Sequence, residues 1–540
     1  MADEILRAAE SEGVVCARAK SYEVPISTGG TVSVFLPHEW YPELVQDRGV
    51  APLCFSEADL AAGGGLCRQL REWAESADVN VEGPLSSVAA LGLHVDGVQY
   101  TSSVRAGSAK SIVVGAMNIV SGTRDDIKNR RQPLFLLRKA RLCQCGCQGF
   151  HTMQELMEVL AWSMQCLADG LSPSTRHDGS AWTEHDLRHR IANNIDLPTA
   201  ALLQVRGDWE GLQQLFNLRS VGADHFCWMC NSTRLTDGPM HYSDFRPDAA
   251  HRASLITHAE YMASCARERV QPSFLFRCPG LKLQHLTVDV MHAADLGTFQ
   301  DAIGSLFWLE ISHKTWHRSQ KIGLERLNRA LNLFYSAHAN DNLSKVTPVS
   351  YSQIYSKNPG FPTLKAKAAQ TRHLIDFCVT LAQQHQHGSA SRPPFRFRAN
   401  HRLAARTDEH RQKLVSLFVG MQEFARSLLD EPFDPAAARR GMYQYLTNLK
   451  DLNTLWRDGA AERAIPKLPF HLRPKCHACQ HLVEDKLDIF GNPSSFWCYR
   501  DEDFVGCVKI IARKTLHPAT LERRVMQKLR ILAALTDGFL

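Results

Sequence analysis

The stretch 203–230, LQVRGDWEGLQQLFNLRSVGADHFCWMC, decides the fold of this chain of 540 residues. An apolar run over 200–205 predicts a buried strand, and Asp208 follows at its end. The pattern of an amphipathic helix comes next, and Cys227 and Cys230 close the stretch as a Cys-x-x-Cys pair. A strand therefore carries a carboxylate to its tip, and the segment after the next helix supplies half of a metal site.

The composition is that of an ordinary globular protein, with 44% apolar residues, 22% charged residues and a formal charge of +6. The length allows about two to four domains. No apolar run approaches the roughly 18 residues that span a bilayer, and the acidic start lacks the features of a signal peptide. We therefore expect an intracellular protein with no membrane partner. Its 16 cysteines should be reduced thiols, some of them holding metal.

A second acidic strand end precedes the opening stretch. Residues 86–100, SSVAALGLHVDGVQY, rise through apolar residues to Asp96, and 111–120, SIVVGAMNIV, form a buried strand pattern. A helical stripe over 152–168 leads to the strand of Asp208. The order strand, strand, strand, helix, strand, helix is that of a ribonuclease H-like core, in which adjacent strand tips would bring Asp96 and Asp208 together.

The rest of the chain is read as additions to this α/β core. Residues 231–470 carry helical stripes at 326–334, 369–383 and 414–429, which predict a large, mainly helical insertion. We therefore expect four parts, which are an N-terminal α+β region of unknown role (1–85), the first part of the core (86–222), a zinc-linked helical insertion (223–470) and the C-terminal part of the core (471–540).

Two stretches rich in basic residues could contact a phosphate backbone. Residues 505–530 contain seven basic residues and a single acid, Glu522. Residues 124–141 contain seven basic residues and two acids. A solvated surface explains both runs equally well, because nothing in the sequence places the charges on one face.

The Cys227 and Cys230 pair needs two more ligands to complete a tetrahedral zinc site. His477 and His481 are four residues apart and so lie on one face of a helix. Cys476 and Cys479 would instead give a site of four cysteines. Either pairing ties the late segment back to the early one.

A further group of possible metal ligands occurs at 143–151, CQCGCQGFH. Cys143, Cys145 and Cys147 with His151 could hold a metal ion. The alternating cysteines fit a single zinc awkwardly, because the usual spacing leaves two to four residues between ligands.

Several carboxylates that converge on one point would suit phosphodiester chemistry. Two Mg2+ ions about 4 Å apart can activate the attacking oxygen and stabilise the leaving one. Magnesium prefers hard oxygen ligands. Asp96, Asp208 and one acid from 501–503 could supply them, although any single acid at a strand end is more often a solvated cap.

Six motifs in this order resemble the DDE transposases of the CACTA (En/Spm) type and their relatives, Transib and the RAG recombinase. They are HVDG (94–97), GDWE (207–210), CWMC (227–230), DVMHAADLG (289–297), HACQH (477–481) and DEDFVG (501–506). The resemblance implies a catalytic triad of Asp96, Asp208 and Glu502 that binds Mg2+ or Mn2+. It also implies a structural Zn2+ held by Cys227, Cys230, His477 and His481.

For function, the resemblance implies an enzyme of the nucleus that cleaves and joins double-stranded DNA at element ends and at a target. It allows a homodimer, and it gives His292 no role. Two departures keep other interpretations open: the first 85 residues show no DNA-reading motif, and Asp501 and Asp503 flank Glu502. The alternatives are a domesticated, catalytically inactive DNA-binding protein and a zinc-stabilised interaction protein.

Overall fold

A computed structural model describes residues 21–535 of the chain, with gaps. The gaps are 77–78, 80, 82, 102–109, 187, 190–194, 236–237, 313–318, 347, 355–359, 387–403, 464–467, 516 and 518–519. Among the described residues no helix is both long and apolar enough to cross a membrane.

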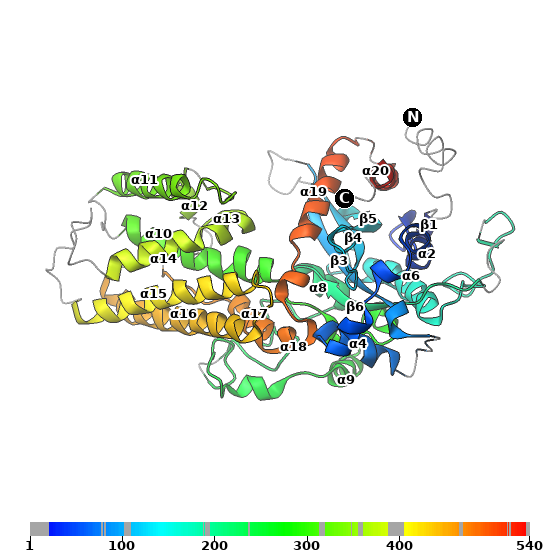
Figure 1. The fold of residues 1–540 in the computed structure, drawn as a ribbon, viewed down its shortest axis with the longest axis horizontal. Coiled ribbons are helices and arrows are strands. Elements are labelled where there is room, and N and C mark those ends of the chain that lie inside the picture. Colours follow the sequence, from blue (N-terminus) through cyan, green and yellow to red (C-terminus); the bar gives the residue numbers. More distant parts are fainter. Residues whose placement is uncertain are drawn as a thin grey trace.

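A six-stranded sheet forms the centre of one half of the molecule (Figure 1). Its strands, in spatial order, are β1 (Tyr22–Pro25), β2 (Thr31–Val34), β5 (Gln132–Arg138), β4 (Ser111–Ile119), β3 (Ala89–Gln99) and β6 (Ala200–Arg206). All neighbouring pairs are antiparallel except β3 and β6, which run parallel. The prediction of a mixed α/β fold is therefore confirmed.

Helices cover both faces of this sheet. They are α2 (Pro37–Arg48), α3 (Glu57–Ala62), α4 (Gly65–Ala74), α5 (Asp125–Lys128), α6 (Phe150–Asp169), α8 (Trp209–Phe216), α19 (Tyr499–Arg513) and α20 (Leu521–Leu535). Apolar side chains of α2, α6 and α8 pack on one face. Apolar side chains of α19 and α20 pack on the opposite face, over β4 and β5. Those of α3 and α4 pack on β3 and β6.

The central strand β4 shows why its sequence is a continuous apolar run. Successive side chains of a strand point to opposite faces. Val113, Met117 and Ile119 join the cluster around α6. Ile112, Val114 and Ala116 join the cluster around α19 and α20. A strand buried on both sides has no polar face to show.

A second half of the molecule is built of helices and lies beside the sheet (Figure 1). Its helices, with those that lead into and out of it, are α9 (His258–Glu268), α10 (Phe299–Ser312), α11 (Gln320–Ala337), α12 (Tyr351–Ile354), α13 (Ala368–His373), α14 (Ile375–Gln386), α15 (Ala404–Ser427), α16 (Pro435–Arg463), α17 (Pro474–His481) and α18 (Leu487–Phe490). The stripe at 326–334 lies within α11, and that at 369–383 spans α13 and α14, which Leu374 separates. The stripe at 414–429 lies in α15 except for its last two residues.

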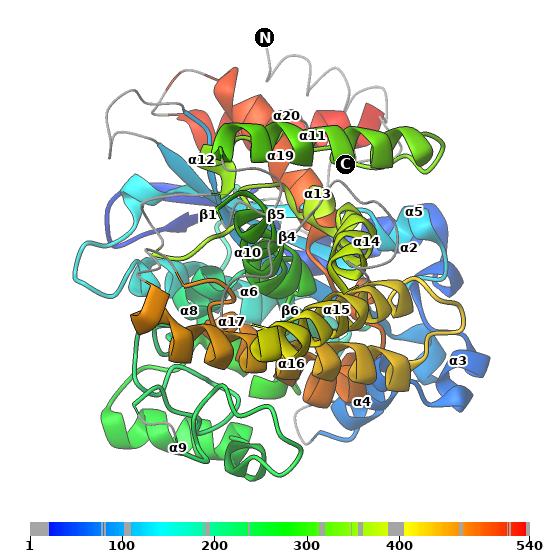
Figure 2. The same ribbon diagram turned by 90° about the vertical axis from the view of Figure 1, so that its left-hand side faces the viewer.

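Figure 2 shows α15 and α16 side by side. Two glycines allow this close approach. A Cβ at Gly441 would lie 2.4 Å from the Phe424 backbone nitrogen, and a Cβ at Gly420 would lie 2.7 Å from that of Tyr445. Any side chain at either position would push the helices apart.

The first 85 residues contribute strands to the same sheet. β1 pairs with β2, and β2 pairs with β5 through Val34 and Phe135. The buried side chains of both strands belong to the core cluster of α6. This part of the chain therefore extends the sheet.

A buried ion pair fastens α19 to the sheet. Asp501 is fully buried and accepts hydrogen bonds from Arg131 Nε at 2.5 Å and Arg206 Nε at 3.1 Å. Burial would raise the pKa of Asp501, but Arg206, His94 and Arg131 hold it well below its usual range. Gly92 makes room for the guanidinium, since a Cβ there would lie 2.4 Å from Arg206 Nη1.

We expect Asp501→Asn to destabilise the protein by about 3 kcal/mol or more, because two buried guanidinium groups would lose their counter-charge. Asp503→Asn is the matched control on the same helix, since the Asp503 side chain is 75% exposed. Calorimetry should show a large drop in the unfolding midpoint for Asp501→Asn alone. Equal midpoints in the two variants would contradict the anchoring role.

Candidate active site and metal centre

Asp96 and Asp208 lie at the same edge of the sheet, because the parallel strands β3 and β6 run toward it side by side. The prediction that a strand ends at Asp96 is wrong, because β3 stays paired with β4 as far as Gln99. Asp208 follows the end of β6 at Arg206, as predicted. Asp208 caps α8, and its Oδ1 accepts a hydrogen bond from the Gly211 nitrogen at 2.6 Å. The turn into α8 packs directly on β3. A Cβ at Gly207 or at Gly211 would lie only 2.9 Å from the carbonyl oxygen of Val95.

Glu502 on α19 joins the two aspartates. Its carboxyl group is close enough to Asp96 for a side-chain hydrogen bond. The neighbouring acids point elsewhere, because successive helix residues are about 100° apart. Asp501 pairs with arginines beneath the sheet, and Asp503 lies 3.8 Å from Arg500 in solvent. Of the three candidate acids, Glu502 alone therefore lies at this edge.

The three carboxylates are neighbours without forming a tight ligand set. Among the described residues, the groups whose ligand atoms all lie within 4.8 Å of one another do not include Asp96, Asp208 and Glu502 together. Burial and then the charge of Asp96 raise the pKa of Asp208. Burial and the adjacent Asp96 raise the pKa of Glu502 to about 8. Both shifts arise first from burial and then from the negative charge of Asp96.

His292 faces the same carboxylates. Its Nδ1 lies 2.6 Å from Asp289 Oδ2, and its Nε2 lies 3.8 Å from Glu502 Oε1. Burial alone would lower the pKa of His292, but the bond to Asp289 and the surrounding acids raise it to about 9. Asp289 is held by the backbone nitrogen of Cys498 at 2.9 Å, so it fixes the ring in place. Asp289 lies two residues before a π-helical turn, Met291–Thr298, and His292 lies within it. Such turns are common at functional sites.

A second group of side chains converges where the loop after α8 meets α17. We call Cys227, Cys230, His477 and His481 the buried cluster. The Cys230 sulfur lies 3.2 Å from His477 Nε2 and 3.3 Å from His481 Nε2. The Cys227 sulfur lies 3.5 Å from His481 Nε2, and the two ring nitrogens are 3.1 Å apart.

These distances fit a tetrahedral zinc ion. Zinc bonds of about 2.3 Å to sulfur and 2.0–2.1 Å to nitrogen place the ligand atoms roughly 3.3–3.8 Å from one another. Two ring nitrogens that face each other inside a protein need a proton or a cation between them. Asp485 Oδ2 lies 2.5 Å from His481 Nδ1 and would orient that ring, as outer partners of metal ligands do. The buried cluster could therefore hold a zinc ion.

The alternative of four cysteines is not formed in this structure. Cys476 and Cys479 are not members of the buried cluster. The Cys476 sulfur lies 3.3 Å from Thr298 Oγ1 instead. On α17 the histidines face Cys227 and Cys230.

Three residues that matter for this arrangement have no predicted role in the sequence analysis, although Asp289 begins the quoted motif DVMHAADLG. Arg206 ends β6 beneath the carboxylates, Asp289 orients His292, and Asp485 orients His481. The last two carry a weak signal, because an acid three or four residues from a histidine on a helix can contact it. Arg206 carries none, since a charged residue at a strand end is normally expected in solvent.

Three of the seven basic residues at 124–141 pair with buried acids. Arg131 pairs with Asp501, and Arg138 and Arg141 lie 2.7 Å and 3.6 Å from the buried Glu522. The late run is different. Arg513, Lys514, Arg523 and Arg524 on and after α19 and on α20 are exposed. The late run thus offers four exposed basic residues to a phosphate backbone, and the early run offers two, Arg124 and Lys128.

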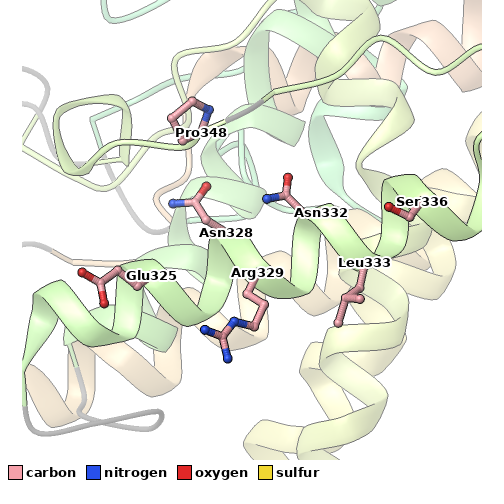
Figure 3. A pocket seen from close by; sticks show the side chains of 7 residues that line it. All are labelled: Glu325, Asn328, Arg329, Asn332, Leu333, Ser336 and Pro348. Carbon is pink, nitrogen blue, oxygen red and sulfur yellow. The ribbon is translucent and has the colours of Figure 1, made fainter.

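A shallow pocket of about 480 Å³ lies along α11, in the helical half of the molecule (Figures 1 and 3). Its lining is Glu325, Asn328, Arg329, Asn332, Leu333, Ser336 and Pro348. None of these is a predicted site residue. The pocket does not belong to the candidate site.

No protein-family model matches this sequence, and no curated protein matches it. A solved structure, the Drosophila P element transposase strand transfer complex, aligns with 92% of this chain and 96% of that chain. The TM-score is 0.34 and the sequence identity 11%. A similarity at that level assigns no residue and no activity to this chain.

We expect Cys230→Ser to lose one zinc equivalent per chain relative to the parent protein, because it removes a sulfur that contacts both histidines. Cys479→Ser should keep the full zinc content, since that thiol is buried outside the buried cluster. Elemental analysis after gel filtration measures both. Loss of zinc from both variants would favour the site of four cysteines, because Cys230 belongs to both ligand sets and Cys479 to that one alone.

Proposed function

We propose that this protein is a transposase-like DDE enzyme with a ribonuclease H-like core, which cleaves and joins DNA strands. One observation carries the proposal. Asp96, Asp208 and Glu502 come from three elements far apart in the sequence, and they gather at one edge of the sheet beside His292.

In this proposal the three carboxylates hold two divalent cations, Mg2+ or Mn2+. When bound, such ions activate water or a DNA 3'-hydroxyl for attack on a phosphodiester. The pKa values of Asp208 and Glu502 are raised, so their ionised forms are unfavourable in the protein alone. A bound cation would stabilise those ionised forms. His292, protonated and fixed by Asp289, would add a positive group beside the phosphate.

The buried cluster has a structural role in the proposal. It joins α17 to the loop after α8, and thus keeps the late segment that carries Glu502 close to the strand that carries Asp208. The ligand set of two cysteines and two histidines with no open position fits a structural zinc rather than a catalytic one.

In this proposal the exposed basic residues of α20 contact the phosphate groups of the DNA backbone. Arg523 and Arg524 are exposed on the helix that packs against β5, while Glu522 on the same helix is buried. DNA that contacts them would bind in a salt-sensitive manner. The six sequence motifs of this chain occur in the order found in CACTA-type transposases, which supports the same function. On this proposal the enzyme acts in the nucleus, on element ends and on a target DNA.

We expect Asp208→Asn to reduce Mn2+-dependent nicking and joining of duplex DNA at least about 100-fold, because several kcal/mol of charge stabilisation depend on the cations. Glu210→Gln is the matched control two residues away, since the Glu210 side chain is 74% exposed. Product formation on labelled linear DNA gives the readout. Activity that is equal in wild type and Asp208→Asn would remove the enzyme assignment.

Divalent cation binding should also release a proton. At pH 7 Glu502, with a pKa of about 8, is mostly protonated, and a cation binds its ionised form. Binding should therefore release about one proton at pH 7 and progressively less above pH 8. Calorimetry in buffers of different ionisation enthalpy measures this number. Glu502→Gln should abolish the release and Asp503→Asn should preserve it; the same release in wild type and Glu502→Gln would exclude Glu502 as the ligand.

A further inference from the structure

Four possible metal ligands gather at a second place, on the surface. We call Cys143, Cys145, Cys147 and His151 the surface cluster, whose ligand atoms all lie within 4.8 Å of one another. It occupies the connection between β5 and α6. Its burial differs from that of the buried cluster, because Cys145 and His151 are exposed.

The geometry of the surface cluster is close to that of a tetrahedral site. The Cys145 sulfur lies 3.1 Å from that of Cys147, 3.9 Å from that of Cys143 and 3.2 Å from His151 Nδ1. The Cys143 and Cys147 sulfurs are 3.2 Å apart. Zinc bonds of about 2.3 Å place sulfurs roughly 3.8 Å apart, so two of these pairs need to open by about 0.6–0.7 Å. All the separations exceed the disulfide bond length of about 2.05 Å, so the thiols are unbonded.

The backbone explains how alternating cysteines can meet at one point. Gly146, Gln148 and Gly149 have positive φ values of 89°, 56° and 88°. These left-handed residues turn the chain back on itself between Cys145 and His151. The awkward spacing that the sequence suggests is thereby overcome.

The neighbouring structure holds the loop in this shape. The Cys143 nitrogen donates a hydrogen bond to Thr152 Oγ1 at 3.0 Å. Gln148 accepts hydrogen bonds from two side chains of α8, its carbonyl from Gln214 Nε2 at 2.8 Å and its Oε1 from Gln213 Nε2 at 3.1 Å. The loop therefore rests on the helix whose first turn Asp208 caps.

We propose that the surface cluster binds a second zinc ion, separate from the buried cluster, which fixes the connection between β5 and α6 against α8. Three thiolates and one imidazole are a complete ligand set for structural zinc. β5 and β3 are both antiparallel to β4 and so end at the same edge of the sheet. The second zinc thus stiffens a loop at the edge where Asp96 and Asp208 lie, and its presence does not depend on the proposed activity.

Zinc content of the full-length protein tests this inference. Wild type purified under reducing conditions should contain two zinc equivalents per chain, and Cys145→Ser and His151→Ala should each contain one. Cys507→Ser, which changes a partly exposed thiol outside both clusters, should contain two. Because the Cys145 side chain is exposed, we expect Cys145→Ser to fold normally, so that a loss of zinc reports on the ligand itself. Circular dichroism of each variant checks the fold.

Release of zinc to a chromogenic chelator gives a second readout in unmodified protein. Wild type should release one equivalent rapidly, from the surface cluster, and the second only slowly or on unfolding. Cys145→Ser should lack the rapid phase and keep the slow one. A wild type that holds a single equivalent, which Cys145→Ser retains, would overturn the proposal. Mass spectrometry that finds Cys145 and Cys147 joined as a disulfide in the reduced preparation would also overturn it.

Discussion

The ion pair of Asp501 with Arg206 and Arg131 is the interaction on which the arrangement of this molecule depends. It joins the late helix α19 to β6 and to the start of β5 in a place that water does not reach. Charges buried in this way tolerate little displacement, because each would be left without its partner. Glu502, the next residue, is thereby held at the edge of the sheet beside Asp96.

The buried cluster adds a second tie between distant parts of the chain. The helical half of the molecule begins after Cys230 and ends where α17 carries His477 and His481. Both ends of that half therefore meet at one place, next to the sheet. Bringing the two ends of this long segment together costs conformational entropy. That cost increases only slowly with the length of the segment, so a few strong contacts between the ends are enough to offset it. The helical half can then be large without disturbing the carboxylates.

The sequence predicts the local elements well, because their signals are local. The apolar run of β4 and the tip of β6 at Asp208 follow from residue patterns alone. The identity of the third acid does not, because 501–503 are consecutive and the direction of each side chain depends on where α19 packs. The contacts with Arg206 and Arg131 show that Asp501 faces inward, and nothing in the sequence marks either arginine as its buried partner.

Partners far along the chain also decide the place of the first 85 residues and of the basic run at 124–141, so composition alone does not predict either. Two short strands cannot reveal that they pair with β5, since register depends on partners far along the chain. Basic residues in sequence likewise do not show that Arg138 turns toward Glu522 on α20. Charge counts describe what a segment could bind, and packing decides which charges remain available.

The central claim is that Asp96, Asp208 and Glu502 form one binding site for divalent cations. Anomalous diffraction from crystals soaked in Mn2+ tests it most directly. The account predicts manganese peaks bonded to oxygens of all three residues at about 2.1 Å. Manganese bound elsewhere, with these three side chains free of it at saturating concentration, would contradict the account.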